Sequence, residues 1–389
     1  MSAEPGLDPV LNPYVPGAGA RPRTLAGREG QLSAFDITAQ RVRSGQSAQI
    51  TGVVGLRGVG KTVLLRSFAD IAERHDLHAT AIEGSAFDLL RGVTRGVRRL
   101  LLELRGGRMP TRALRVLRSF SVTFPVGIGV ELSPLRGQAD SGDLDSDLTD
   151  LLLATGAAAA SQQRGLLLAI DEVQTVPAAE LGALMAALHR MAQEQLPVTA
   201  ALAGLPDAVR AIAAARTYAE RMVAWQTLDR LDQDDAGAAL TGPSAELGIR
   251  WTTPAVAAVV ERSEGYPYFL QEYGRHVWNV AAGDPIRLTD VERAEPRVRG
   301  HLDEGFFRGR LDRVPDSERR YLVALAGLGQ GERRSGDVAR AMHKTTQQVG
   351  ALRDRLIAEG ICYSPRYGYV AFSVPQFDSF IRRTLGPAT

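Results

Sequence analysis

Three glycines, a lysine and a threonine between residues 55 and 62 have the spacing of a loop that binds phosphate. Glycines let the backbone turn its N–H groups toward an anion, and a lysine directly after them adds a positive charge. Lys61 is expected to reach the β- and γ-phosphates of a nucleotide, and the Thr62 hydroxyl to hold a magnesium ion. The residues predicted to bind ATP with Mg²⁺ are Gly55, Gly58, Val59, Gly60, Lys61, Thr62 and Val63.

Two neighbouring carboxylates, Asp171 and Glu172, end the apolar run that begins at Gly165. In open α/β sheets the ligand lies at the carboxyl ends of the strands, so a residue that ends one strand can face the loop that follows another. Asp171 is therefore expected to complete the magnesium shell, and Glu172 to polarise the water that attacks the γ-phosphate. The alternative is an ordinary acidic strand end.

The elements around these residues predict an α/β P-loop NTPase core with a parallel sheet. An apolar strand is expected at 50–54, directly before the glycines, and helical spacing follows Lys61, which disfavours a chance glycine-rich turn. Arg221, before an expected fifth strand at 222–226, is a candidate for sensing the γ-phosphate of a neighbouring subunit, or else a helix cap. The other expected strands cover 79–83, 165–172 and 196–203.

Length and composition fit a soluble protein of two or three domains. The chain has 389 residues, 44% of them hydrophobic, and a net charge of +2, which argues neither for nor against nucleic acid. A single cysteine, Cys362, excludes an internal disulfide and fits a reducing compartment. We find neither a secretory signal nor an apolar run long enough to cross a membrane, so a cytoplasmic protein without membrane contact is expected.

Changes of pattern along the chain predict four segments and one insert. A proline-rich extended arm at 1–24 precedes the core at 25–228, a helical lid at 229–312 and a last segment at 313–389. The insert, near 86–135, holds nine arginines between Arg91 and Arg118 against one acid, Glu103. These arginines form either a solvated helix face or a surface for an anionic partner. A hairpin is expected at 120–124 and 127–132.

The last segment has the order of a winged helix. Helices are expected at 317–328, 336–342 and 346–359, followed by strands at 361–363 and 367–372. On the third helix, Gln347 and Gln348 are candidates to contact bases, whereas Arg355 and the wing residue Arg366 are candidates to contact phosphates of DNA. Winged helices also dock proteins, and this alternative stays open.

The glycine loop, the Asp171–Glu172 strand end, Gly27-Arg28-Glu29 and Gly265-Tyr-Pro267 together resemble the STAND and archaeal-type P-loop ATPases, which neighbour the origin-recognition-like AAA+ ATPases. The resemblance covers about residues 20–285, and a C-terminal winged helix is also typical of the origin-recognition-like members. It implies that Gly27 and Arg28 border the adenine and that Pro267 closes over it. The polar sensor that many such ATPases carry after the fourth strand is replaced here by Ala203 and Gly204, so slow hydrolysis is expected.

The sequence thus predicts a slowly hydrolysing ATPase switch that couples its nucleotide state to a winged helix bound to DNA. One alternative is an oligomeric ATPase that remodels DNA, which would need homo-oligomers. Another is a signalling scaffold whose winged helix docks a protein partner.

Overall fold

The computed structural model describes residues 6–17, 19–84, 88–104, 111–124, 126 and 133–386. The chain divides into two compact units. The first comprises Met1–Gly27, Gly55–Gly60 and Leu228–Thr389, and the second comprises Arg28–Val54 and Lys61–Thr227. The glycine loop therefore belongs to the first unit, while the strand before it and the helix after it belong to the second.

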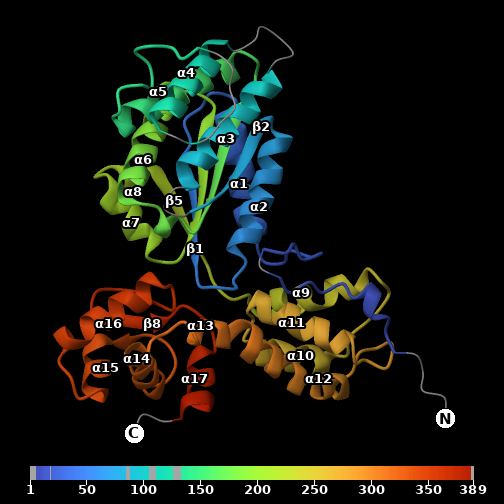
Figure 1. The fold of residues 1–389 in the computed structure, drawn as a ribbon. Helices are drawn as coiled ribbons and strands as arrows, with labels where there is room; N and C mark the ends of the chain where they lie inside the picture. Colours follow the sequence, from blue (N-terminus) through green and yellow to red (C-terminus); the bar gives the residue numbers. More distant parts are fainter. Residues whose placement is uncertain are drawn as a thin grey trace. The chain divides into compact units, whose positions relative to one another are not determined.

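The second unit is built on a five-stranded sheet with the order β2-β3-β4-β1-β5 (Figure 1). The pairs β2–β3, β3–β4 and β4–β1 are parallel. This arrangement confirms the predicted parallel-sheet core, and each of the five strands expected in the core overlaps an observed one. The strands are β1 (Ile50–Gly55), β2 (Leu77–Glu83), β3 (Gly165–Asp171), β4 (Val198–Gly204) and β5 (Val223–Leu228).

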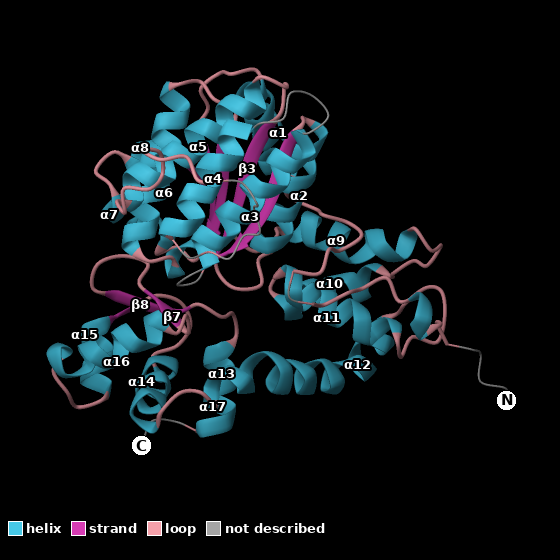
Figure 2. Cartoon of the chain, turned by 45° about the horizontal axis from the view of Figure 1, so that its top comes forward, coloured by secondary structure: helices cyan, strands magenta, loops and turns pink. Residues whose placement is uncertain are grey.

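Helices cover both faces of this sheet (Figure 2). On one face α1 packs on α2, where the rings of Phe35 and Phe68 stack with centroids 4.4 Å apart. On the other face Leu166, Leu168 and Ile170, alternate residues of β3, join a core that includes α3 to α6. The helices are α1 (Glu29–Arg43), α2 (Lys61–Arg74), α3 (Asp88–Glu103), α4 (Thr111–Thr123), α5 (Leu144–Ala160), α6 (Ala178–Gln193), α7 (Ala208–Ala215) and α8 (Ala219–Met222).

The arginine-rich insert contributes α3 and α4. In α3 an apolar stripe is buried, with Val93, Val97 and Leu100 fully covered. The predicted strand at 120–124 is wrong, because α4 continues to Thr123 and buries Phe120 as part of a helical stripe. The partner strand expected at 127–132 lies outside the described residues.

The first unit contains a group of helices in the range where the sequence predicts a lid. Its helices are α9 (Gln233–Ala245), α10 (Thr253–Ser263), α11 (Pro267–Trp278), α12 (Leu288–His301), a π-helical turn η4 (Leu302–Arg308) and α13 (Gly309–Leu311). Pro267 occupies the first position of α11, where its missing N–H leaves no helical hydrogen bond unmade.

The N-terminal segment packs on this helical group through Tyr14. The Tyr14 hydroxyl donates to the carbonyl of Leu240 at 2.6 Å and accepts from the indole N–H of Trp251 at 3.1 Å. Burial raises the pKa of Tyr14 to about 12. The short 3₁₀ turn η1 (Pro9–Leu11) is the one regular element found among the described residues before α1.

The C-terminal part of the first unit combines helices with a small antiparallel sheet of order β6-β8-β7. The three expected helices and two expected strands are present, whereas β6 and α17 were not anticipated. The elements are α14 (Asp316–Gly327), β6 (Arg333–Arg334), α15 (Ser335–Ala341), α16 (Thr346–Ala358), β7 (Cys362–Tyr363), β8 (Tyr369–Phe372) and α17 (Phe377–Leu385). Cys362 is fully buried in β7. None of the described helices has the length and apolar character needed to span a membrane.

Candidate nucleotide site

The glycine loop adopts backbone conformations that other residues rarely reach. Gly58 and Gly60 have φ of 85° and 95°, in the region that disfavours a Cβ atom. A Cβ on Gly55 would lie 2.4 Å from the carbonyl oxygen of Leu228. The three glycines are therefore required by the path of the backbone itself.

Helix α2 begins at Lys61, directly after the last glycine of the loop. The first turn of a helix leaves backbone N–H groups without helical partners and carries the positive end of the helix dipole. The Lys61 side chain is buried, with 7% of its surface exposed. Loop and helix thus combine N–H donors, a dipole and a lysine, which is the arrangement that binds phosphate.

A hydrogen bond joins the start of α2 to the carboxyl end of β3. The Thr62 hydroxyl donates to a carboxylate oxygen of Asp171 at 2.5 Å. These residues follow β1 and end β3, two strands that are separated by β4 in the sheet. A hydroxyl and a carboxylate offer the oxygen ligands that Mg²⁺ prefers, so this pair fits a magnesium site.

Glu172, the residue after Asp171, has a left-handed backbone with φ of 48° and ψ of 40°. Such a conformation is uncommon for a residue with a side chain, and it clusters at functional sites. The Glu172 N–H donates to Asp171 Oδ1 at 2.8 Å, and the Glu172 carbonyl accepts from the Thr175 N–H at 2.9 Å. The turn therefore fixes Glu172 next to the carboxylate that bonds Thr62.

Gln174 is a site residue that the sequence reasoning missed. Its amide nitrogen donates to Glu172 Oε2 at 2.5 Å, and its amide oxygen accepts from the Leu205 N–H at 3.1 Å. A Cβ on Gly204 would lie 2.4 Å from the same amide oxygen. Gln174 thus places a polar group at the end of β4, where the strand itself offers only alanine and glycine.

Asp207 is a second missed residue close to Glu172. Burial raises its pKa, and the nearby Glu172 charge adds to this increase although Arg210 opposes it. Its Oδ1 atom is buried and has no hydrogen-bond partner among the described residues. The sequence showed Asp207 only as part of a helix start.

The residues expected around the adenine lie at the starts of two helices. Gly27 has φ of 67°, and a Cβ there would lie 2.4 Å from a carboxylate oxygen of Asp235. Arg28 is buried directly before α1. Pro267 opens α11, and the next residue, Tyr268, donates its N–H to the Gly58 carbonyl at 3.2 Å. The start of α11 thus contacts the glycine loop within the first unit.

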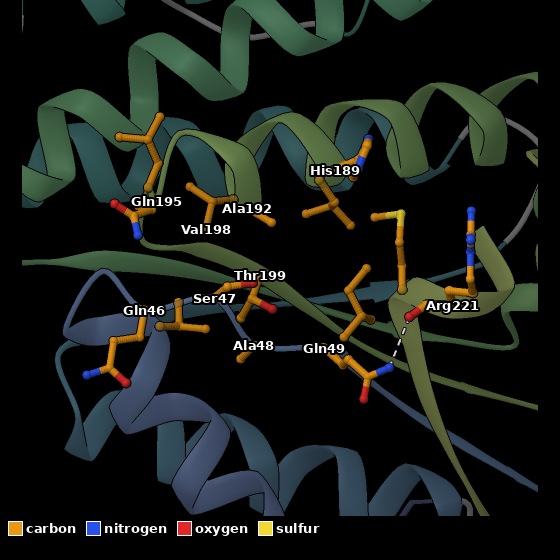
Figure 3. A pocket seen from close by; sticks show the side chains of 15 residues that line it. Gln46, Ser47, Ala48, Gln49, His189, Ala192, Gln195, Val198, Thr199 and Arg221 are labelled. Carbon is orange, nitrogen blue, oxygen red and sulfur yellow. Dashed lines mark hydrogen bonds between the residues drawn. The ribbon is translucent and has the colours of Figure 1, made fainter. Parts of the chain in front are cut away.

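Arg221 lies near the amino ends of the strands, on the opposite side of the sheet from Thr62 and Asp171. It lies in the last turn of α8 and lines a cavity of about 300 Å³ together with residues at the amino ends of β1 and β4, such as Gln49 and Thr199 (Figure 3). Gln49 donates its amide N–H to the Arg221 carbonyl at 2.9 Å. Thr62 and Asp171 lie beyond the carboxyl ends of the parallel strands, so Arg221 does not join them within one chain.

The candidate DNA residues on α16 are exposed, but two of them have partners within the chain. Val349 is buried on the inner face of this helix. Gln348 accepts from the Thr345 N–H at 2.9 Å in a capping box. Arg355 pairs with Glu318, a buried carboxylate on α14. Gln347 lies on the exposed side.

The turn between β7 and β8 carries Arg366. Its guanidinium lies 3.3 Å from a Glu332 carboxylate oxygen and 3.8 Å from the centre of the Tyr369 ring. The adjacent Tyr367 side chain is fully exposed. An arginine and an aromatic ring thus stand together at the tip of this small sheet.

Comparison with known proteins identifies the class of the core. Residues 24–202 match the AAA ATPase domain family, and residues 304–381 match a domain of unknown function, DUF8462. The Walker-type ATPase PABY2304 of Pyrococcus abyssi is similar with a TM-score of 0.60 and 16% identity, over 93% of this chain and 97% of that chain. The Aeropyrum pernix ORC2 protein (ADPNP-ADP complexes) is similar with a TM-score of 0.52 and 14% identity, over 95% of this chain and 98% of that chain.

The search of curated protein sequences gives no match. At identities this low the two structural likenesses concern the fold alone. The match over residues 24–202 covers the glycine loop, Asp171 and Glu172, so the predicted AAA-type class of the core is confirmed.

Proposed function

We propose that the protein is an ATP-dependent switch that binds ATP at the glycine loop and hydrolyses it slowly. The observation that carries this proposal is the hydrogen bond between Thr62 and Asp171, which joins residues 109 positions apart at the end of the glycine loop. Thr62 and Asp171 would hold Mg²⁺, whose role is to neutralise charge on the phosphates. Lys61 and the N–H groups of the loop would bind the β- and γ-phosphates. Gly27, Arg28 and Pro267 are proposed to surround the adenine.

Glu172 is proposed as the base that takes a proton from the attacking water. Gln174 would hold the Glu172 carboxylate by its 2.5 Å hydrogen bond, and would also link it to the Leu205 N–H after β4. Because Ala203 and Gly204 supply no polar side chain to the γ-phosphate, we expect low turnover.

Contacts inside the first unit support a route from the glycine loop to the C-terminal elements. The Arg57 N–H donates to the Ser373 carbonyl at 3.1 Å, and the Arg57 guanidinium donates to the Gly360 carbonyl at 3.3 Å. Arg57 lies inside the glycine loop, between Gly55 and Gly58. A movement of the loop on nucleotide binding would therefore act directly on the segment around β7 and β8.

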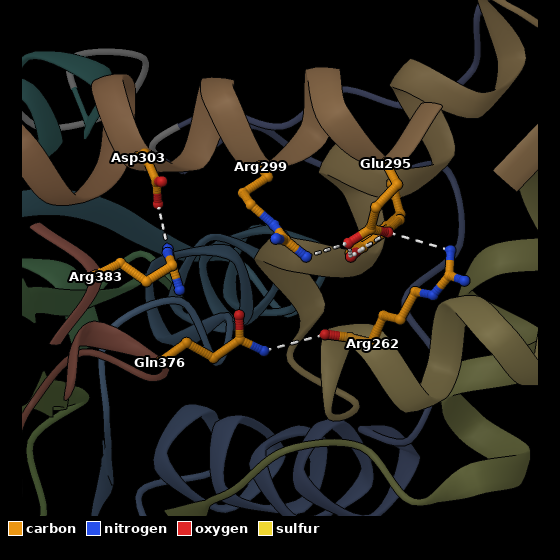
Figure 4. A network of polar contacts seen from close by, with 7 residues as sticks. Arg262, Glu295, Arg299, Asp303, Gln376 and Arg383 are labelled. Atoms are coloured by element: carbon orange, nitrogen blue, oxygen red, sulfur yellow. Dashed lines mark hydrogen bonds and ion pairs between the residues drawn. The ribbon is translucent and has the colours of Figure 1, made fainter. Parts of the chain in front are cut away.

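The lid helices are also tied to the C-terminal elements (Figure 4). Gln376 donates its amide N–H to the Arg262 carbonyl at 3.0 Å, and Arg383 pairs with Asp303 at 2.7 Å. The ring of Phe307 in η4 stacks on Phe380 of α17 with centroids 5.2 Å apart. These contacts would couple lid closure to the position of the last segment.

We propose that this last segment is a winged helix that binds duplex DNA. Gln347 and Gln348 at the start of α16 would contact bases, while Arg355 and Arg366 would contact phosphates. A protein-docking role is the second candidate. It is favoured by the pairs that Arg355 and Arg366 make within the chain, since those pairs reduce the charge offered to DNA.

The proposal is tested by comparing two variants of the full chain. Lys61→Ala should abolish ATP binding, because the phosphates lose their cation. Glu172→Gln should keep ATP binding and lose about 100-fold or more of the turnover, because a general base contributes that much. Binding is measured by calorimetry and turnover by phosphate release. Equal loss of binding in both variants would contradict the role of Glu172, and normal binding by Lys61→Ala would overturn the site.

A further inference from the structure

Three side chains with metal-binding groups meet in the first unit. None of them is among the residues proposed to bind or hydrolyse the nucleotide. Glu272 and His276 lie one turn apart on α11, and His301 is the last residue of α12. The Glu272 side chain is fully buried, whereas His301 is partly exposed. One ligand atom from each residue lies within 4.8 Å of the other two.

The distances in this cluster fit ligands of one ion better than hydrogen bonds. His276 Nε2 lies 3.5 Å from Glu272 Oε2, and His301 Nδ1 lies 3.3 Å from Glu272 Oε1. Good N–H···O hydrogen bonds measure about 2.7–3.2 Å. Donor atoms at about 2.0–2.1 Å from a tetrahedral Zn²⁺ ion are roughly 3.3 Å from each other.

Burial makes a cation at this place favourable. Glu272 Oε2 and His276 Nε2 are both buried, face each other at 3.5 Å and have no other polar partner among the described residues. A carboxylate removed from water is costly unless a positive group compensates its charge. Glu272 Oε1 accepts a hydrogen bond from the Tyr268 hydroxyl at 2.9 Å. Such a bond from outside the ligand set orients a metal-binding carboxylate.

We propose that Glu272, His276 and His301 bind a divalent transition metal ion of the zinc class. Two imidazoles and one carboxylate suit such ions, and three protein ligands leave one coordination position for water. This site is separate from the proposed magnesium site at Thr62 and Asp171.

The position of the site indicates a structural role for the ion. His301 directly precedes the π-helical turn η4, where the chain leaves the lid for the C-terminal elements. The ring of Phe306 in this turn stacks on Tyr268 with centroids 4.6 Å apart. A bound ion would therefore fix the end of α12 to α11 beside a turn type that often marks functional sites.

The test uses Co²⁺, which reports tetrahedral coordination through its visible absorption. Full-length protein is freed of metal with a chelator and titrated with Co²⁺, and Zn²⁺ is then added as a competitor. We expect one Co²⁺ ion per chain and complete displacement by Zn²⁺. His301→Ala and Glu272→Gln should bind Co²⁺ at least about 100-fold more weakly, because loss of a direct ligand exceeds the 10–100-fold effect of an outer partner. His343→Ala, which removes an exposed histidine elsewhere, should bind as the unchanged protein does.

Thermal unfolding guards against a variant that fails to fold. Zn²⁺ should raise the Tm of the unchanged protein and of His343→Ala, because a ligand that binds only the folded state stabilises it. The Tm of His301→Ala should not respond to Zn²⁺, although this partly exposed residue can be replaced with little effect on the metal-free protein. Absence of Co²⁺ binding by the unchanged protein overturns the proposal. The proposal is also overturned if both ligand variants lose less than about tenfold in Co²⁺ affinity. Tenfold is the lower limit for a residue that only bonds a metal ligand and does not contact the metal.

Discussion

Polar residues lie in two regions: at the carboxyl ends of the strands of the central sheet, here called the sheet edge, and on the exposed side of the C-terminal elements. The residues of the two regions have different kinds of partners. At the sheet edge, Thr62 bonds Asp171 across 109 positions of sequence, and Gln174 bonds Leu205 across 31. On α16, Gln348 bonds Thr345, three positions away, as a helix cap. Polar groups from distant segments that converge at a strand end serve no local structural need.

The two regions also differ in what their polar residues offer to a ligand. The carboxyl ends of the strands bring together Glu172 with a left-handed backbone, the buried Lys61 and the hydroxyl–carboxylate pair of Thr62 with Asp171, groups that suit phosphate and its metal ion. The candidate DNA residues Arg355 and Arg366 instead satisfy Glu318 and Glu332 within the chain. DNA binding therefore requires that existing pairs be exchanged for new ones.

The largest effect is expected for Arg221. Replacing this residue tests whether the side of the sheet at the amino ends of the strands also takes part in catalysis. If Arg221 reaches the γ-phosphate of a neighbouring subunit, Arg221→Ala should lower turnover about 1,000-fold while ATP binding is unchanged, as for known arginine fingers. Phosphate release and nucleotide calorimetry measure the two quantities.

A mixing experiment provides the control for Arg221. Arg221→Ala subunits retain an intact glycine loop, and Lys61→Ala subunits retain Arg221, so a mixture should recover part of the activity. A monomer in solution whose turnover is unaffected by Arg221→Ala would leave this residue a structural part of the cavity at the amino ends of β1 and β4.

Replacing Gln174 tests whether this residue holds Glu172, the proposed base, in place. Gln174→Ala should lower kcat by about 10–100-fold with an unchanged KM for ATP, because a base contributes about 100–10,000-fold and keeps part of this when misplaced. In a Glu172→Gln background the same change should have no further effect on kcat. Gln193→Ala, at the exposed end of α6, is the matched control. An additive loss in the double variant would show that Gln174 acts independently of Glu172.

The core was predictable from sequence because its signals are local. Glycine spacing at 55–60 and an apolar run ended by Asp171 and Glu172 can be read without knowing which strands are neighbours. The contact of Gln174 with Leu205 depends on how η3 (Val173–Thr175) packs against the end of β4, and no periodic pattern encodes it. The cluster of His276 with His301 likewise exists only because α11 packs on α12.

The error at 120–124 has a similar physical cause. Phe120 and Phe124 alternate with polar residues, which suits a strand, yet their rings lie 4.9 Å apart because they stand one helical turn from each other. The surrounding residues Leu114 and Leu117 continue the same buried stripe of α4. A short segment that fits both periods is decided by its tertiary packing.

Replacing Arg57 tests whether the glycine loop and the C-terminal elements are coupled. Its contacts with Gly360 and Ser373 join the glycine loop to the C-terminal elements. We expect ATP to change hydrogen-exchange protection around residues 360–373 in the unchanged protein, and this change to fall several-fold in Arg57→Ala. Arg190→Ala, an exposed arginine of α6 paired with Glu194, should respond as the unchanged protein does. If protection responds to ATP equally in both variants, the route through Arg57 is excluded.

The smallest effect is expected for DNA binding. Measuring it decides whether the C-terminal elements also bind an external ligand, as is proposed for the sheet edge. Each phosphate contact adds about one unit to the slope of log affinity against log salt concentration, so Arg366→Ala in the full chain should reduce this slope by about one. Because Glu332 lies 3.3 Å from the Arg366 guanidinium, Glu332→Gln should strengthen binding by releasing that arginine for phosphate. Arg250→Ala, which removes an exposed arginine between α9 and α10, should leave the slope unchanged. If duplex DNA shows no salt-dependent affinity for the full chain with ATP or without it, the pairs of Arg355 and Arg366 are structural, and the C-terminal elements are assigned to docking a protein partner.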